Sequence, residues 1–417
     1  MARILVYTTP AAGHVFPLVP GLLELQRRGH EVHVRVGEKL LAATRAAGLD
    51  ASPADPRIAD IEVNDFAPGK ATDKLRKGIH ELLARGPLER ADMERAVVER
   101  DPDLLIVDTL VYGAAVAAEA SGRRWATAQP SPLPLPGKGI PPYGMGLAPM
   151  RGPLGRVRDF LGWRLVEQLY GRSMLPKLNA MRSEAGLPQL SSPIENVLAP
   201  DRILCLTGDP LEYPRTDTHE RVRFVGGQLW DPPAGHTDLA WLDEPGDPWV
   251  LVTCSTDYQA DEQLAICAVE ALRHEPVRVV LTLADAYDTV TLPPAANVRV
   301  ERFVPHAPVL ERAAAVVCHS GMGIVQKAVA AGVPIAAVPF GRDQPEVARR
   351  VIEAGAGVQL PARKLTPERL RATVREALAL RAGAQAAGAR LRAAGGGARF
   401  ADAAEELVPN GVVAAAA

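Results

Sequence analysis

The sequence predicts an α/β protein built from two Rossmann-like domains whose parallel sheets face a central cleft. At 417 residues the chain is too long for one ordinary hydrophobic core, so we expect two domains. In each half, short apolar strands alternate with helices, which is typical of doubly wound parallel sheets. The alternation restarts after a stretch rich in proline, glycine and aspartate, which indicates a linker between two similar halves.

The elements of the first half follow from this alternation. A helix from about Val15 to Arg28 is closed by Gly29, and an alanine-rich helix separates two later strands. The expected strands are Ile4–Thr8, Glu31–Val36, Leu104–Val107, Trp125–Ala128 and Arg202–Leu206. We therefore assign residues 1–210 to an acceptor-binding domain, 211–240 to the linker and 241–390 to a nucleotide-sugar domain. Residues 391–417 form a helix and tail, for which a return to the first domain is one expected course.

Residues 130–153 interrupt the pattern with eight prolines, together with Tyr143 and Met145. Such a stretch forms no regular element. A long apolar loop either lines a ligand site or packs irregularly, and proline content does not separate the two. A helix over about 155–185 follows, in which Phe160 and Trp163 are further candidates for the wall of an acceptor site.

The second half begins with strand Val250–Cys254, a helix over 259–273 and strand Val277–Leu283. Its most informative segment runs from Phe303 to Gln344: strand, short helix, strand ending at Cys318-His319, glycine turn, helix, strand 334–339 and a polar loop. Ligands bind open α/β sheets at the carboxyl ends of strands, where these polar residues gather. The turn His319-Ser320-Gly321-Met322-Gly323 opens a helix, and its N–H groups favour an anion such as a diphosphate.

Composition excludes several function classes. The chain is 47% hydrophobic and 23% charged, as soluble enzymes are, and its net charge of −2 argues against nucleic acid. The cysteines show no metal-ligand spacing and indicate reduced core positions (Cys205, Cys254, Cys267, Cys318). The first residues read as a strand rather than a signal peptide, and no apolar run is long enough for a bilayer. We expect a cytoplasmic protein without stable membrane association.

Two residues of the first half are candidates for catalysis. His14 follows the first strand at the start of a helix, where a histidine can serve as general base or cap the helix. Asp108 ends a neighbouring strand, where it can bond the second imidazole nitrogen of His14 or cap the next helix. The two together are a stronger signal than either alone.

Polar residues also follow the strands of the second half. Ser255-Thr256 can donate to a phosphate or cap a helix, and His319 is placed to donate to a phosphate oxygen. Asp343-Gln344 can exchange hydrogen bonds with vicinal hydroxyls. G-x-G-x-x-G is absent after the first strand, which makes a nicotinamide-dependent dehydrogenase a poor interpretation.

The chain resembles the inverting family 1 glycosyltransferases of the two-Rossmann-domain (GT-B) architecture, notably actinobacterial enzymes that decorate natural products. The resemblance spans nearly the whole length: GH after strand one, IVD, VPH-x-x-VL, H-x-G-x-G, GVP and DQ. It implies that His14 is the base and Asp108 its partner. It further implies that Phe303 stacks on the nucleobase, that the backbone of Val304 bonds the base edge, that His319 contacts the diphosphate and that Asp343-Gln344 bind the sugar.

The implied reaction moves a sugar from a nucleoside diphosphate sugar to a hydroxyl of an apolar natural product, without a metal or other cofactor. Carbon transfer to an aromatic acceptor, a silent nucleotide-binding partner protein and a sugar-nucleotide epimerase remain alternatives. We expect donor contacts from Ser320, Gly321, Met322 and Gly323 besides the residues above. Acceptor contacts are expected from Pro10, Gly13, Phe16, Tyr143 and Met145, and a homodimer remains open.

The sequence departs from the family pattern at two places. Many relatives read H-x-G-x-x-[ST]-x-x-E, with the glutamate on the ribose hydroxyls, where this chain has Ile324 and Lys327. Loss of that carboxylate favours a dTDP-sugar over a UDP-sugar, although Lys327 can also be a solvated helix residue. Ser255 stands where many relatives have glycine, which changes how closely this loop approaches the phosphates.

Overall fold

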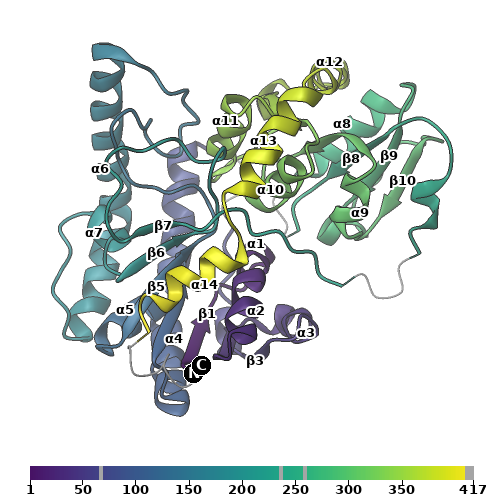
Figure 1. The fold of residues 1–417 in the computed structure, drawn as a ribbon. Helices are drawn as coiled ribbons and strands as arrows, with labels where there is room; N and C mark the ends of the chain where they lie inside the picture. The colour runs from purple at the N-terminus through teal and green to yellow at the C-terminus, as the bar shows by residue number, and fades with distance from the viewer. Residues whose placement is uncertain (65–68, 234–237, 257–260, 409–417) are drawn as a thin grey trace.

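The computed structural model describes residues 1–64, 69–233, 238–256 and 261–408, and it shows two α/β domains (Figure 1). The strands of the first sheet are β1 (Arg3–Tyr7), β2 (Glu31–Val36), β3 (Asp50–Pro53), β4 (Leu104–Asp108), β5 (Arg124–Gln129), β6 (Arg202–Cys205) and β7 (Val222–Phe224). They pair in parallel in the order β3-β2-β1-β4-β5-β6-β7.

The second sheet repeats this topology with six parallel strands. They are β8 (Trp249–Thr253), β9 (Arg278–Thr282), β10 (Val298–Glu301), β11 (Ala313–Cys318), β12 (Ile335–Ala337) and β13 (Gly357–Gln359), in the order β10-β9-β8-β11-β12-β13. The strand order reverses between β1 and β4 in the first sheet and between β8 and β11 in the second. Ligands bind at such switch points. The predicted pair of Rossmann-like domains is confirmed.

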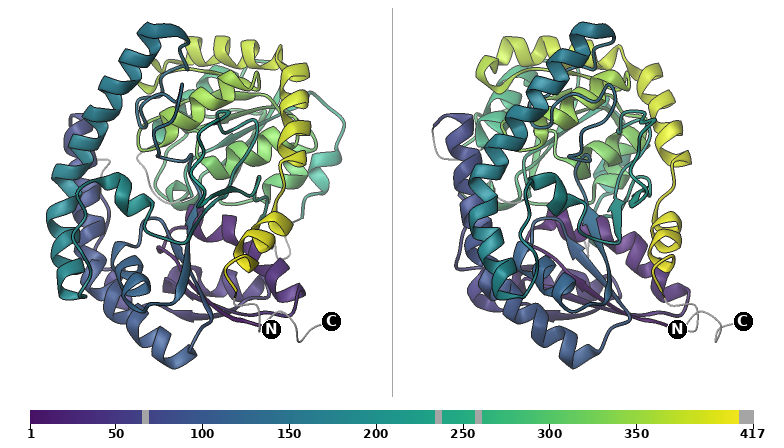
Figure 2. Two further views of the ribbon diagram at one scale, coloured as in Figure 1. Left: turned by 60° about the vertical axis from the view of Figure 1, so that its left-hand side comes forward. Right: turned by 90° about the vertical axis from the view of Figure 1, so that its left-hand side faces the viewer.

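Helices cover both sheets. Those of the first domain are α1 (Ala12–Val15), α2 (Val19–Arg27), α3 (Glu38–Ala46), α4 (Ala71–Arg100), α5 (Tyr112–Ala120), α6 (Gly152–Glu184) and α7 (Pro193–Val197). Then follow α8 (Glu262–Leu272), α9 (His306–Leu310), α10 (Met322–Ala330), α11 (Gln344–Glu353), α12 (Pro367–Leu378), α13 (Arg381–Ala393) and α14 (Gly397–Glu405). Figure 2 shows α6 running along one side of the molecule, from the level of the first sheet to that of the second domain. Within the described residues no helix is long and apolar enough to cross a membrane.

Some expected boundaries need correction. The first helix is not continuous: α1, a 3-10 turn at Phe16–Leu18 and α2 replace it, because Pro17 and Pro20 lack the N–H that a helix interior requires. The predicted linker 211–240 contains β7, which pairs with β6 and extends the first sheet. β7 is a three-residue edge strand in proline-rich surroundings, too short to show a pattern. The first residues of the expected helix 259–273 lie outside the described part.

The C-terminal segment belongs to the first domain by its packing. Helix α14 lies against α2 (Figure 1), and Phe400 is 0% exposed in the first domain's core. Gly21 makes this contact feasible, because a Cβ there would lie 2.2 Å from the Phe400 ring. Arg28 anchors the helix through 2.7 Å hydrogen bonds to Asp402 and Glu405. The tail residues 409–417 lie outside the described part.

The chain passes between the domains at two places that touch each other. Gly396 donates its N–H to the carbonyl of Val225 at 2.7 Å. A Cβ on Gly226 would lie 2.6 Å from the carbonyl carbon of Gly395, so only glycine fits this backbone-to-backbone approach. Both residues also have positive φ, +86° and +128°. The outgoing and returning segments therefore share one crossing point.

Candidate active site

His14 and Asp108 meet at the switch point of the first sheet. His14 lies in α1, directly after β1, and Asp108 is the last residue of the adjacent strand β4. His14 Nδ1 is 2.7 Å from Asp108 Oδ2, and the other carboxylate oxygen accepts the N–H of Leu110 at 2.9 Å. The Asp108 side chain is 0% exposed, whereas that of His14 is 21% exposed. The pair thus has a buried anchor and an accessible imidazole.

Charges around His14 set its basicity. Burial acts to lower the pKa of His14, but the charge and hydrogen bond of Asp108, together with the charge of Asp343, outweigh burial and raise it. Burial in turn raises the pKa of Asp343, opposed by the charge of His14. These two residues come from different domains, and the charge of each affects the pKa of the other. The carboxyl edges of the two sheets therefore face each other at one site.

The loop between β12 and α11 holds the expected sugar-binding pair. Asp343 is the N-cap residue of α11, and Gln344 is the first residue of that helix. The side-chain oxygen of Gln344 accepts the N–H groups of Phe340 and Gly341 at 2.7 and 3.2 Å. Gln344 therefore shapes the loop that presents Asp343, a role that the sequence did not indicate.

The predicted anion-binding turn lies at the second switch point, between β11 and α10. Gly321 is the N-cap residue of α10, so the N–H groups of Met322 and Gly323 lie in the first, unpaired turn of a helix. A Cβ on Gly321 would lie 2.4 Å from His319 Nε2, which explains why glycine follows at this position. Ser320 is buried at φ +73°, a left-handed conformation that turns the chain into the helix. The imidazole of His319 is thereby placed beside the helix N-terminus.

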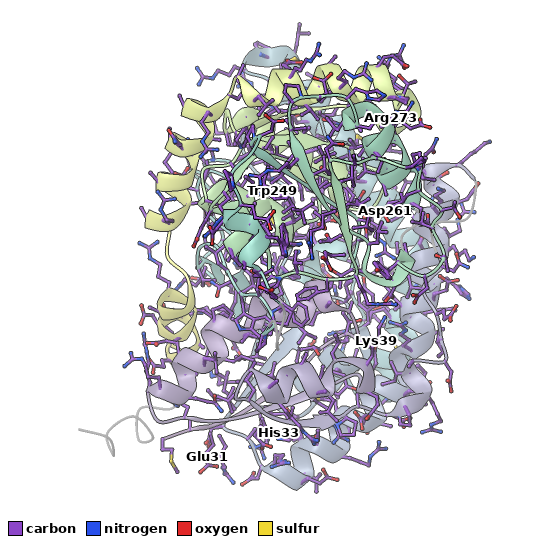
Figure 3. The ribbon with its side chains drawn as sticks, turned by 90° about the vertical axis from the view of Figure 1, so that its right-hand side faces the viewer. Glu31, His33, Lys39, Trp249, Asp261 and Arg273 are labelled. Atoms are coloured by element: carbon purple, nitrogen blue, oxygen red, sulfur yellow. The ribbon has the colours of Figure 1, made fainter. Side chains whose placement is uncertain are left out.

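Asp261 is a buried residue of this region that the sequence analysis missed. Its Oδ2 accepts both the N–H and the hydroxyl of Ser255, at 2.8 and 2.9 Å, and lies 3.7 Å from Nδ1 of His319. Figure 3 labels Asp261 in the second domain, above Lys39 of the first. Burial lowers the pKa of His319 despite this carboxylate. The hydroxyl of Ser255 is engaged within the protein, whereas Thr256 is exposed.

The expected nucleobase contacts lie in the segment that follows β10 (Val298–Glu301). Phe303 follows that strand rather than belonging to it, and its side chain is 38% exposed, while Val304 is buried in the second domain's core. Lys327 of α10 is not a solvated helix residue: its Nζ lies 2.5 Å from Oδ1 of Asp231. The other oxygen of Asp231 accepts the N–H of Ala307 at 2.9 Å. Burial acts to raise the pKa of Asp231, but Lys327 lowers it overall.

The expected acceptor residues are only partly brought together. Gly13 has open space beside its Cα. The pKa of Tyr143 is raised by burial and, next in importance, by the charge of Asp343, which indicates that Tyr143 lies near that carboxylate. Met145 is exposed, on the same loop. Phe16 instead packs against Trp230 in a tilted arrangement, with ring centroids 5.0 Å apart, and Pro10 packs against Gly37. The last two are structural contacts at the edge of the site.

The helix after the loop contributes differently from the expectation. Phe160 is exposed beside Arg164, and Trp163 donates its indole N–H to the carbonyl of Ile140 at 3.0 Å. Tyr170 lies two turns further along α6, and burial together with the charges of Asp343 and Glu346 raises its pKa to about 12, which indicates that this part of the helix faces the site. Helical periodicity alone did not distinguish it from a core residue.

Glu89 of α4 is a second missed residue, close to the His14–Asp108 pair. It is 0% exposed, and its Oε2 accepts the N–H of Gly113 at 3.0 Å, while Oε1 lacks a partner among the described residues. Burial raises the pKa of Glu89 to about 8, with a further contribution from Asp108. The raised pKa favours the protonated form of Glu89 near neutral pH.

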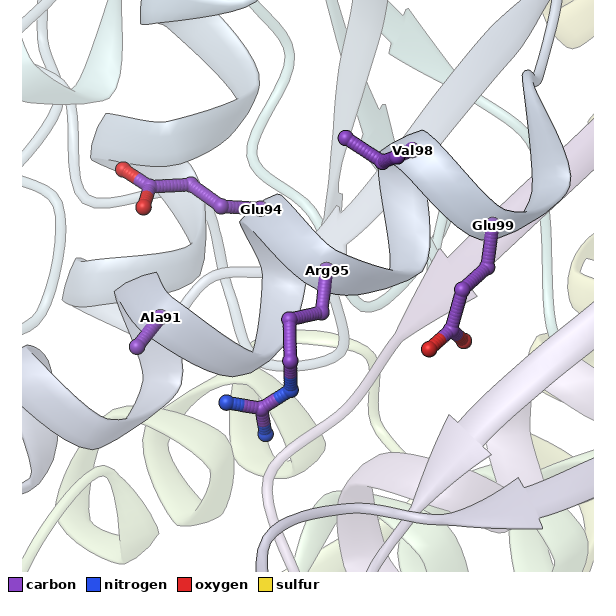
Figure 4. Close-up of a pocket in the computed structure, with 5 residues that line it drawn as sticks. All are labelled: Ala91, Glu94, Arg95, Val98 and Glu99. Carbon is purple, nitrogen blue, oxygen red and sulfur yellow. The ribbon is translucent and has the colours of Figure 1, made fainter.

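A surface depression on α4 is a different feature. It is lined by residues of one helix, Ala91, Glu94, Arg95, Val98 and Glu99 (Figure 4). These residues precede β4 and therefore lie toward its amino end, opposite the edge that carries Asp108. In the described part of the chain no group of three or more His, Cys, Asp or Glu side chains could hold a metal ion.

Comparison with known proteins agrees with this geometry. Residues 265–406 match the erythromycin biosynthesis protein CIII-like C-terminal domain. The chain is 32% identical over 394 residues to 4'-demethylrebeccamycin synthase of Lentzea aerocolonigenes, covering 90% of this chain and 92% of that protein. It is 26% identical to L-demethylnoviosyl transferase of Streptomyces niveus, over 86% of this chain and 85% of that one.

Solved structures show the same architecture. The glycotransferase of kitacinnamycin superposes with a TM-score of 0.74 at 25% identity, over 98% of this chain and 99% of that one. The glycosyltransferase VinC, solved in complex with dTDP, superposes with a TM-score of 0.70 at 24% identity, over 97% and 98% of the two chains. The two parallel-sheet domains, together with these relatives, identify a glycosyltransferase of the GT-B fold. The chain belongs to the family of natural-product glycosyltransferases that includes 4'-demethylrebeccamycin synthase.

Proposed function

We propose that this enzyme moves a sugar from a nucleoside diphosphate sugar to a hydroxyl of an apolar natural product, with inversion at the anomeric carbon. The observation that supports this most strongly is the 2.7 Å contact between His14 Nδ1 and buried Asp108, next to Asp343 of the other domain. With Nδ1 held by Asp108, Nε2 is the nitrogen that takes the acceptor proton. The acceptor oxygen then attacks the anomeric carbon, and the nucleoside diphosphate leaves.

The second domain supplies the donor side of this proposal. Negative charge develops on the leaving diphosphate, and the N–H groups at the start of α10 with His319 are arranged to stabilise it. Asp343 is proposed to hold the sugar hydroxyls, and Phe303 to stack on the base. The sugar thus lies between His14 and the α10 turn. An intact pair of His14 and Asp108 argues against a silent nucleotide-binding protein.

A dTDP-sugar is the proposed donor, in preference to a UDP-sugar. Relatives that carry glutamate at the position of Lys327 use it on the ribose hydroxyls. Here Lys327 is an ion-pair partner of Asp231, and both oxygens of Asp231 are engaged, by Lys327 and by Ala307. Neither residue offers a carboxylate dedicated to a 2′-hydroxyl, which dTDP lacks. The dTDP found in the VinC structure is in keeping with this donor class.

Thermal unfolding of the full chain with dTDP, UDP or NAD tests the donor class. A ligand at 100 times its Kd stabilises by about 2.7 kcal/mol. We expect a larger shift in Tm with dTDP than with UDP, and none with NAD. His14→Ala should keep the dTDP shift while release of dTDP from dTDP-glucose, with a panel of phenolic acceptors, falls about 10²- to 10⁴-fold. Equal shifts with both nucleotides would refute the donor preference, and an active His14→Ala variant would refute the base.

A further inference from the structure

A buried charged cluster connects the 130–151 loop to the second domain. Its members are Glu212 after β6 and Glu346 and Arg350 on α11, with side-chain exposures of 4%, 1% and 2%. Arg350 Nη1 lies 2.8 Å from Glu346 Oε2, and Nη2 lies 3.8 Å from Glu212 Oε2. The guanidinium of Arg350 therefore bridges a carboxylate of each domain.

Each carboxylate of this cluster also accepts a backbone N–H from the loop. Leu133 donates to Glu212 Oε1 at 2.9 Å, and Gly146 donates to Glu346 Oε1 at 2.7 Å. Hydrogen bonds to buried charged groups are among the strongest in proteins. Two points of the loop, 13 positions apart in the sequence, are thus both bonded to one cluster.

Gly146 is fitted closely against the first turn of α11. Its φ is +59°, and a Cβ there would lie 2.8 Å from the carbonyl oxygen of Pro345. Its own carbonyl accepts a hydrogen bond from Nε of Arg349 at 3.2 Å. Gly146 therefore contacts α11 through its N–H, its carbonyl and its Cα at once.

The 130–151 loop and helix α11, which these contacts join, carry the acceptor side and the sugar side of the proposed site. The loop carries Tyr143 and Met145, which are expected on the acceptor side. Helix α11 begins with Asp343 and Gln344, and Glu346 lies in the same first helical turn. Movement of this turn therefore reaches Gly146 directly, and Tyr143 is three residues before that contact.

We infer that Glu346 is a positioning residue that couples sugar binding to the placement of the acceptor loop through Gly146. This inference rests on the proposed function. Sugar binding at Asp343 stabilises the first turn of α11, and Glu346 and Pro345 transmit that stabilisation to the loop. The acceptor wall is then fully ordered only when donor is bound, so an acceptor is best received by the donor complex.

Gly146→Ala separates this contact without removing any charge from the cluster. Gly139→Ala is the matched control, because Gly139 lies in the same loop at φ +76° with nothing near its Cα. Hydrogen–deuterium exchange of peptides covering 140–151 is measured with and without dTDP-glucose. We expect dTDP-glucose to slow exchange in the wild type and in Gly139→Ala, and to have at most a small effect in Gly146→Ala.

Steady-state kinetics with dTDP-glucose and a phenolic acceptor give the second readout. Gly146→Ala should raise the acceptor KM about tenfold or more, the order expected for losing a hydrogen bond to a charged group, with less than about a threefold change in the Kd of dTDP. Glu346→Gln, which keeps an oxygen for the Gly146 N–H, should retain more coupling than Glu346→Ala. The coupling would be overturned if dTDP-glucose slows exchange in both glycine variants, or if it slows exchange in neither of them. Failure of the wild type to bind dTDP-glucose would overturn the proposed function and the coupling with it.

Discussion

Replacing Asp108 with asparagine tests the proposed catalytic pair with almost no change in shape. The carboxylate is fully buried, and its Oδ2 lies 2.7 Å from His14 Nδ1. A hydrogen bond to a charged group contributes about 1.5–3 kcal/mol, and each 1.36 kcal/mol of barrier is about tenfold in rate. Loss of this stabilisation therefore slows transfer by about 10- to 150-fold. If the asparagine amide instead donates to Nδ1, the wrong tautomer results and the loss approaches about 10⁴-fold.

The pH profile gives this experiment a sign as well as a magnitude. The proposed base can act only when His14 is neutral, so the raised pKa of His14 should set the pH below which activity falls. Asp108→Asn removes the largest contribution that raises this pKa, and burial, which lowers it, then has more weight. We expect the acid limb of kcat to move to lower pH as the plateau falls. Initial rates of dTDP release from pH 5 to 9 measure both effects.

The chain contains a matched control for Asp108→Asn. His33 Nδ1 lies 2.7 Å from Oδ2 of Asp50, so this pair has the same atom types at the same distance as His14 and Asp108. Asp50, however, is an exposed residue of β3. Asp50→Asn should leave the rate and the pH profile unchanged. An Asp108→Asn enzyme that transfers sugar within about twofold of wild type, with an unmoved acid limb, would refute the catalytic role of the pair.

Three further predictions concern stability and donor binding. Burial raises the pKa of Glu89 to about 8, so the native carboxyl keeps a proton that the unfolded chain releases above about pH 4.5, and stability falls as pH rises between these values. Glu89→Gln should flatten this fall in urea unfolding at pH 5 and pH 8, and an unchanged slope would contradict it. Phe303→Ala should weaken dTDP binding, measured by calorimetry, about tenfold to hundredfold. The Tm should stay unchanged because the side chain is partly exposed, and retained affinity would exclude stacking. Phe400→Ala should lower the free energy of unfolding by about 3–5 kcal/mol, because the ring is buried against Gly21, and a loss below about 1 kcal/mol would mean that α14 contributes little.

Much of the fold was predictable because parallel strands buried on both faces leave continuous apolar runs in the sequence. β4 and β8 are buried at every residue and were expected within one residue of their observed bounds. Strands such as β7 and β13 have three residues each and pair at edges, where a short run carries no period. The long helix α4 was not expected, since Pro87 and sparse apolar positions mask its period.

The site was predictable where strand ends determine the position of a side chain. His14 and Asp108 follow or end adjacent strands of the first sheet, and His319 and Asp343 follow adjacent strands of the second, so the topology brings each pair to one edge of its own sheet. Residues that reach the site through tertiary packing gave no such signal. Asp261 and Asp231 reach their partners from loop segments, and Tyr170 and Glu89 lie on long helices whose facing is decided by neighbouring elements. Their contacts depend on how segments distant in the sequence pack together, and no local sequence pattern predicts that packing.

The shared glycine crossing also determines how the enzyme can be divided. A fragment ending near residue 240 would lack α14, and the apolar surface of α2 that covers Phe400 would face water. A hybrid enzyme that takes its first domain from this chain must therefore carry residues 397–408 along with the first 225, as a discontinuous module. Junctions at Gly226 and Gly395 must come from one parent, since a side chain on either would push the two backbones apart. Exchange of the first domain between relatives thus needs two junctions, and single-junction chimeras are expected to be unstable.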